Sequence, residues 1–328
     1  PITSAGPLSP QGAAMEVRLY AEIPHANFQP SAGLLTEVKF PEGARIDGWI
    51  ETGTEVTPYY DPMLAKVIVT GKDRSAAIAA LNAALAETSV CGIETNLQYL
   101  RAIAASELLA SGKVATTALK DFAFRPQSIE VIVPGAQSSL QELPGRLHLW
   151  HVGVPPSGPM DERSFRRANG LVGNDETACA LEMTVNGPAL RFHAPATVAL
   201  SGALMPAKLD GVEVPHDAPF AVEAGQMLAI GTIQGPGQRT YLAVGGAFQA
   251  PEVLGSRATF ARGQFGGHAT GTLKAGDALH LAPPEERPAV PETVAIAPAP
   301  LTRAWQIGVV YGPHGAPDFF QDADIDDL

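Results

Sequence analysis

With 328 residues, of which 45% are hydrophobic and 17% charged, the chain has enough apolar material for about two buried cores. Its formal net charge of −12 argues against a general nucleic-acid binder, whose affinity depends on a basic surface. The only cysteines, Cys91 and Cys179, exclude a disulfide framework and favour a reducing, cytoplasmic compartment, and no apolar run is long enough to cross a membrane.

The first part of the chain contains strand patterns. Apolar and polar residues alternate over Met15–Ile23, which predicts a half-buried strand. Two further strands are expected over Gly33–Phe40 and Ala65–Gly71.

Two helices are expected after these strands. Apolar residues at helical spacing predict a helix over Arg74–Thr88, for which Ser75 is a possible N-cap. A second helix is expected over Thr95–Ala105. Strands and helices together predict an α+β unit over residues 1–123.

Residues 129–328 have a different pattern. Short apolar runs follow one another with turn residues between them, and Asp210-Gly211 between two such runs predicts a two-residue hairpin. Apart from a helix expected after Met160, this part is predicted to be mainly β, a barrel or a sandwich. We expect a linker over 124–128 and an exposed Pro-rich connector over 283–300.

The segment from Arg45 to Asp61 carries one cation followed, near its end, by two adjacent tyrosines. One interpretation is a loop that leads into a strand. The other is a shaped rim that presents Arg45 to a ligand, with Tyr59 among the aromatic walls nearby.

Four motifs in this part occur in the order MEVRLYAEIP, FQPSAGLL, YYDPMLAKVIVTGKDRSAAI and CGIETNLQYL. Over nearly all of residues 12–123 they resemble the C-terminal subdomain of biotin carboxylase. In that family an Arg lies sixteen residues before the Asp of the Tyr-Tyr-Asp motif, as Arg45 precedes Asp61 here. The resemblance implies that Arg45 and Tyr59 bind the cofactor biotin. Arg45 would stabilise the enolate-like oxygen formed when N1 of the ureido ring loses its proton.

Two departures from that family bear on the chemistry. The family's Gly-His before the first strand is Gly12-Ala13 here, so any contact made by that His is absent. The ATP-grasp half of the family is missing, and no glycine-rich nucleotide loop occurs. ATP and Mg would therefore be bound mainly by an N-terminal part that is not in this chain.

A run of Pro and Gly residues, VGVPPSGPMD, precedes the helix expected after Met160. In one interpretation Asp161 only caps that helix. In the other, free backbone N–H groups around Ser157 and Gly158 meet a carboxylate or carbamate at the positive helix end. The prolines and glycines would hold these donors in place without reorganisation.

Two more residues are candidates for binding a substrate. His314 follows Pro313 on an expected turn and could exchange a proton near neutral pH, although a lone His on a turn is more often structural. Ser201 could direct its hydroxyl to a ligand, but a Ser at a strand end is common. The eight His do not cluster at ligand spacing, so no metal site is expected.

The second part resembles the allophanate hydrolase subunit 2 family, on the run LHLWHVGVPPSGPMDERSFRRANGLVGN and the later WQIGVVYGPHGAPDFF. That fold, a cyclophilin-like β-barrel, supplies half of the carboxyltransferase domain of urea carboxylase and guanidine carboxylase. The resemblance covers essentially all of residues 129–328. It implies that the loop with Ser157, Gly158 and Asp161 is a wall of the carboxyltransferase cleft.

A biotin carboxylase tail followed directly by this barrel half is similar to the urea carboxylase and urea amidolyase family. The implied reaction carboxylates biotin with ATP and bicarbonate. A biotinyl carrier domain of the same parent chain then carries the CO2 to urea, which gives allophanate; guanidine is the alternative substrate. The biotin carboxylase part could also carry homodimer contacts.

The chain is interpreted as an internal fragment that is inactive alone, because it opens at Pro1 and lacks the biotinyl Met-Lys-Met motif. Two other interpretations stay open. Related barrel proteins are 5-oxoprolinase subunits and inhibitors of a sporulation kinase, so the barrel could be a binding module, although the fused biotin carboxylase piece argues against it. The third interpretation is an α+β and β-barrel fragment without a surviving site.

Overall fold

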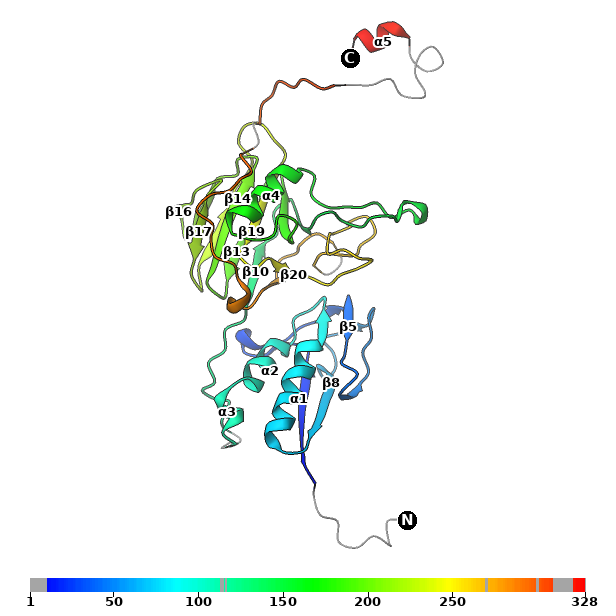
Figure 1. Ribbon diagram of the computed structural model, residues 1–328, viewed down its shortest axis with the longest axis vertical. Coiled ribbons are helices and arrows are strands. Elements are labelled where there is room, and N and C mark those ends of the chain that lie inside the picture. Colours follow the sequence, from blue (N-terminus) through cyan, green and yellow to red (C-terminus); the bar gives the residue numbers. More distant parts are fainter. Residues whose placement is uncertain are drawn as a thin grey trace.

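The computed structural model describes residues 11–112, 115, 117–268, 271–298, 301–308 and 321–327. His314 lies outside these ranges. Figure 1 shows two bodies along the chain, a first one with mixed helices and strands and a second one built mostly of strands. The multi-domain α+β organisation predicted from the sequence is confirmed.

The first unit is built on a three-stranded antiparallel sheet in the order β1-β8-β6. Its strands are β1 (Ala13–Tyr20), β8 (Met63–Gly71) and β6 (Arg45–Gly48). Helix α1 (Arg74–Glu87) packs against β8 and β1, while α2 (Leu97–Ala104) packs against α1 (Figure 1). The apolar side chains of the sheet and helices form one buried core, to which Leu19, Val67, Leu81 and Leu97 belong.

Helix α1 begins where a side chain can satisfy its first free N–H groups. Asp73, which is extended, accepts a hydrogen bond from the Ala76 N–H at 2.8 Å. The prediction of Ser75 as the N-cap was therefore wrong, because Ser75 already lies in the first turn of the helix.

The expected strand over Gly33–Phe40 is divided in two. Strand β4 (Gly33–Leu34) pairs with β7 (Glu55–Val56), whereas β5 (Glu37–Lys39) pairs with β9 (Ser89–Cys91). The chain changes partner at the fully buried Leu35, so one apolar run serves two separate ladders. A short hairpin of β2 (Glu22–Ile23) and β3 (Gln29–Pro30), the 3₁₀ turn η2 (Pro24–Ala26) and helix α3 (Glu107–Ala110) complete this unit.

The second unit contains two antiparallel sheets that share a core. The seven-stranded sheet has the order β16-β15-β18-β13-β10-β21-β20, and the five-stranded sheet has the order β11-β12-β19-β14-β17. Their bounds are β10 (Ser128–Val133), β11 (Gln137–Gln141), β12 (Ala180–Thr184), β13 (Ala189–Phe192), β14 (Ala196–Gly202), β15 (Ala207–Leu209), β16 (Val212–Glu213), β17 (Pro219–Val222), β18 (Met227–Ile230), β19 (Arg239–Val244), β20 (Phe248–Gln249) and β21 (Ala278–Leu281).

The predicted mainly β character is confirmed, and within the described residues the two sheets are not paired edge to edge into one closed barrel. Residues of both sheets, such as Ile129 and Leu242, meet in the same buried cluster. Helix α4 (Glu162–Leu171) covers the other face of the five-stranded sheet, where Phe165 packs edge-on against Tyr241 (Figure 1). The unit thus has three layers.

The hairpin expected at Asp210-Gly211 is present. Leu209 pairs with Val212, and both turn residues have positive φ, 48° at Asp210 and 86° at Gly211. Positive φ at both central positions is the turn that matches the twist of paired strands.

The two units touch through polar groups. The ring of His280 on β21 lies 2.6 Å from a carboxylate oxygen of Glu94, and the rings of His25 and His193 are 4.2 Å apart. The Gln127 N–H donates to the Gln98 side chain at 3.1 Å. The expected boundaries of the units, with a linker over 124–128, stay a prediction. Among the described residues no helix has the length and apolarity that a membrane span requires.

Candidate functional site

Arg45 lies on the solvent-exposed face of the first sheet. Strands expose alternate residues on one face, so Arg45 and Asp47 of β6 point the same way, and Lys66 of β8 lies opposite Asp47. Arg45 donates through Nε and Nη2 to the two Asp47 oxygens at 2.9 and 3.2 Å, and Lys66 Nζ lies 3.0 Å from Asp47 Oδ2. The hydrogen bonds from Arg45 and then Lys66 lower the pKa of Asp47.

The same face carries a second arginine that the sequence analysis missed. Arg18 of β1 lies opposite Lys66 in the sheet register, and it contacts Glu16 at 3.4 Å and the Tyr20 side chain. The Arg45 side chain is 74% exposed and that of Arg18 is 59% exposed, so both can meet a ligand from solvent. Arg18 is therefore a second candidate on this face beside Arg45.

The aromatic side chains after Arg45 are exposed as the rim interpretation expects. Tyr59 and Tyr60 are each 83% exposed, and Trp49 donates from Nε1 to the Met63 carbonyl at 2.8 Å. Asp61 has a local role, because its Oδ1 accepts the Met63 N–H at 2.8 Å. Within the described part of the chain, no hydrogen bond or ring contact joins Tyr59 to Arg45.

The loop before α4 is held by side chains that come from the sheet beneath it. We call residues 153–161 the α4 entry loop. The Gly158 N–H donates to Gln141 Oε1 at 3.1 Å, the Met160 N–H to Glu182 Oε2 at 2.8 Å and the Asp161 N–H to the Tyr241 hydroxyl at 2.8 Å. The expectation of free N–H groups in this loop was therefore wrong at these three positions, because β11, β12 and β19 each supply an acceptor.

Two of those acceptors are bonded to each other. The Tyr241 hydroxyl donates to Glu182 Oε2 at 2.8 Å, and Arg239 Nε lies 3.4 Å from Glu182 Oε1. Tyr241 is fully buried, and burial, with the Glu182 charge, raises the pKa of its hydroxyl. The hydroxyl thus keeps its proton and can donate while it accepts from Asp161. Glu182 and Tyr241 each place a polar group within an apolar run of the sequence. A buried polar group requires a hydrogen-bond partner, so this pattern is the signal that could have identified both residues.

Asp161 caps α4, as one of the two interpretations predicted. Its Oδ1 accepts the Ser164 N–H at 3.0 Å, and the Ser164 hydroxyl donates to Oδ2 at 2.5 Å. Ser157 and Gly158 both have positive φ, 61° and 90°. A positive φ at a non-glycine residue is strained, so surrounding contacts must hold Ser157 in this conformation.

Upstream of the α4 entry loop the chain projects from the second unit as a long arm that ends in the 3₁₀ turn η3 (Trp150–Val152) (Figure 1). Arg146 anchors the base of the arm: it is 1% exposed and donates to the carbonyls of Val253 at 2.9 Å and Ser256 at 3.1 Å. Its guanidinium also lies 5.0 Å from the ring centre of Phe265.

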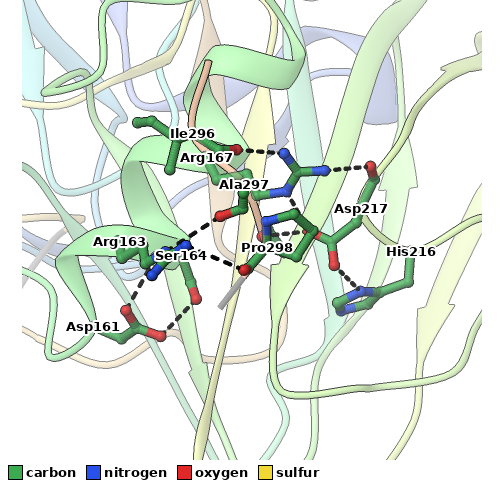
Figure 2. A network of polar contacts seen from close by, with 10 residues as sticks. Asp161, Arg163, Ser164, Arg167, His216, Asp217, Ile296, Ala297 and Pro298 are labelled. Carbon is green, nitrogen blue, oxygen red and sulfur yellow. Dashed lines mark hydrogen bonds and ion pairs between the residues drawn. The ribbon is translucent and has the colours of Figure 1, made fainter. Parts of the chain in front are cut away.

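Ser201 is buried, and its hydroxyl is engaged within the protein. It is 1% exposed and donates to Asp217 Oδ1 at 2.6 Å. Figure 2 shows that Asp217 also meets Arg167 at 2.9 Å and His216 at 3.1 Å. Burial alone would raise the pKa of Asp217, but the hydrogen bonds from His216, Ser201 and Arg167 outweigh it and lower the pKa to about 2.

The Pro-rich connector lies along α4. The carbonyls of Ala297 and Pro298 accept from Arg163 at 3.3 and 3.4 Å, and the Ile296 carbonyl accepts from Arg167 at 2.5 Å (Figure 2). Val294 packs against the core beneath α4. The expected exposed connector is thus attached to the second unit by two arginines of one helix.

Two family models match the chain in the order that the sequence motifs indicated. One is the biotin carboxylase C-terminal domain, over residues 16–121, and the other is the carboxyltransferase domain, subdomain A and B, over residues 152–328. The second match covers more than half of the chain. The chain belongs to this carboxyltransferase family.

Individual relatives agree with that assignment. The chain is 46% identical to the urea amidolyase of Saccharomyces cerevisiae over 323 residues, which are 97% of this chain and 18% of the relative, and 46% identical to that of Lachancea kluyveri. Its structure resembles that of Kluyveromyces lactis urea carboxylase with a TM-score of 0.91 and 44% identity, over 100% of this chain and 30% of the other. The chain spans about a fifth of the length of the curated relatives it matches.

The comparisons confirm the resemblance to urea carboxylase and urea amidolyase. Within this carboxyltransferase family member, the α4 entry loop and α4 lie in the carboxyltransferase match, whereas Arg18, Arg45 and Tyr59 lie in the biotin carboxylase match. The two groups of candidate residues therefore lie in two different family matches.

Proposed function

We propose that this chain is part of a biotin-dependent urea carboxylase, a ligase whose parent protein uses ATP and bicarbonate to convert urea to allophanate. The observation that carries this proposal is the direct succession of a biotin carboxylase C-terminal segment and a carboxyltransferase segment in one chain. The resemblance of both segments together to one urea carboxylase structure supports it.

The exposed face of the first sheet would meet biotin. An accessible guanidinium and exposed aromatic rings fit a small ring that is delivered from outside, and Arg45, Arg18 and Tyr59 offer these groups. Biotin supplies a ureido nitrogen that accepts and releases CO2. When that nitrogen loses its proton, negative charge develops on the ureido oxygen, and a fixed guanidinium stabilises it.

The α4 entry loop would line the carboxyltransferase cleft. Its rigid backbone presents the Ser157 hydroxyl and the helix N-terminus beside a position where the substrate carbamate would form. The Ser157 hydroxyl and the helix N-terminus would be held in position before the substrate arrives, so little reorganisation would oppose carboxyl transfer. His314 is a further candidate for this cleft and lies outside the described residues.

Other components would come from the remainder of the parent protein. ATP and Mg would bind mainly to its biotin carboxylase part outside this chain, and the biotinyl carrier domain would move between the two segments. The biotin carboxylase segment is also where we place a homodimer contact. We assign the parent protein to the cytoplasm because the two cysteines of this chain, Cys91 and Cys179, are unpaired.

The experiment uses the full-length parent protein. ATP cleavage is measured in the presence of bicarbonate with urea, with guanidine and with neither. We expect urea to stimulate ATP cleavage, and biotin blockade by avidin to abolish it. Stimulation by guanidine alone would move the substrate assignment to guanidine, and stimulation by neither would overturn the carboxylase proposal.

A further inference from the structure

Three loop N–H groups donate to three strand side chains, and two of these side chains are bonded to each other. The chain of bonds runs from the Asp161 N–H to the Tyr241 hydroxyl, from that hydroxyl to Glu182 Oε2, and from the Met160 N–H to the same oxygen. Gln141 holds the loop separately at Gly158.

We propose that Gln141, Glu182 and Tyr241 are positioning residues that hold the α4 entry loop in the conformation required for carboxyl transfer. The inference rests on the proposed function, in which this loop lines the carboxyltransferase cleft. None of the three needs to contact the substrate.

Burial makes the network stiff. The side chain of Glu182 is 12% exposed, Gln141 is 6% exposed and Tyr241 is fully buried. Hydrogen bonds are stronger in such surroundings, and a donor that loses its partner there is costly to leave unpaired. The loop can therefore leave this conformation only when several hydrogen bonds to these side chains break.

The loop needs such support because its own backbone does not favour the observed shape. Ser157 has a φ of 61° and is followed by Gly158 with a φ of 90°. Gly158 also lies close to the strand end that carries Gln141, since an added Cβ would be 3.3 Å from the Glu142 carbonyl oxygen. A side-chain acceptor directly below Gly158 then fixes where the neighbouring Ser157 hydroxyl lies.

Tyr241 and its neighbour Thr240 offer a matched pair for the test. Thr240 is also fully buried on β19, and its hydroxyl donates to the Ala203 carbonyl at 2.6 Å, away from the α4 entry loop. Y241F and T240V each remove one buried hydroxyl from the same strand. Only the first change leaves a loop N–H without its acceptor.

The experiment uses the full-length biotinylated enzyme and measures kcat and KM for urea, ATP cleavage driven by free biotin without urea, and Tm. We expect Y241F to lower the urea-dependent kcat about tenfold or more, because a misplaced loop costs transfer rate. The KM for urea should change less, and the free-biotin reaction should stay at the wild-type rate. T240V should lower Tm about as much as Y241F does, and its kcat should stay at the wild-type value.

A second variant guards against a misfolded Y241F protein. Q141M keeps the length of the side chain and removes the acceptor for Gly158, and the same selective loss of urea-dependent kcat is expected. If Y241F, Q141M and T240V had equal kcat values, this inference would be overturned while the proposed function would stand. A wild-type enzyme without urea stimulation would overturn the proposed function and this inference with it.

Discussion

A guanidinium can stabilise a developing oxyanion only when some of its N–H groups are free to meet it. On the exposed sheet face, both oxygens of Asp47 accept hydrogen bonds from Arg45, while Arg18 contacts Glu16 at 3.4 Å and the Tyr20 side chain. Spacing along the chain selected Arg45, but only the sheet register shows that Arg18 lies on the same face beside Lys66. Such a juxtaposition across three strands cannot be derived from local sequence.

We expect R45A and R18A each to reduce biotin-dependent ATP cleavage by the full-length enzyme on the order of a hundredfold, the usual effect of removing an oxyanion donor. Neither change should lower Tm appreciably, because exposed ion pairs contribute little stability. K72A removes a cation that is exposed just before α1 and serves as the control. A loss in R18A alone would transfer the proposed role from Arg45 to Arg18.

At the scale of single elements, α4 begins where the sequence indicated and for the predicted reason. An Asp before a helical pattern is a strong local signal for a helix start, and the Asp161 side chain indeed accepts a hydrogen bond from the Ser164 N–H. The sequence could not show that side chains of the sheet accept hydrogen bonds from the N–H groups of the loop before the cap. Its acceptors at Gln141, Glu182 and Tyr241 lie 17, 22 and 80 residues away from their donors.

The helix cap gives a direct prediction. D161A should destabilise the second unit by about 1 kcal/mol, because the Ser164 N–H loses its acceptor, and lower its Tm by roughly 2–4 °C. D161N keeps an oxygen that caps almost equally well and should recover most of the loss. Thermal unfolding followed by circular dichroism measures both. An equal loss in the two variants would mean that the carboxylate charge, not the cap, supplies the stability.

The connector along α4 is attached through Arg163 and the half-buried Arg167. Arg167 is 11% exposed and joins Asp217 to the Ile296 carbonyl, so R167M should free the connector and raise its cleavage by a nonspecific protease several-fold. Among the described residues Arg166, its neighbour on the helix, forms ion pairs with Glu162 and Glu176 alone, at 3.4 and 3.6 Å. R166M should leave the cleavage rate unchanged. Equal rates in both variants would show that Val294 packing alone holds the connector.

On the scale of the whole molecule, the contact between the two units contains His25, His193, His280 and Glu94. Burial alone would lower the pKa of His280, but the carboxylate of Glu94 raises it above its usual value. Burial would raise the pKa of Glu94, and His280 lowers it instead. His25 and His268 also contribute to the lowering of the Glu94 pKa, whereas Arg101 opposes the rise of the His280 pKa.

These directions determine how the contact depends on pH. A raised His280 pKa means that the ion pair stabilises fully below the unfolded value of about 6.5 and is lost as pH rises through the higher folded value. A lowered Glu94 pKa means that its share is present above about 4.3 and is lost as pH falls through the folded value. The Tm difference between wild type and H280Q should therefore be largest between about pH 5 and 6.5 and shrink at pH 8 and above. E94Q should give the same profile, and the double variant should add no further loss. A difference that does not vary with pH would show that His280 and Glu94 are joined by a neutral hydrogen bond and not by an ion pair.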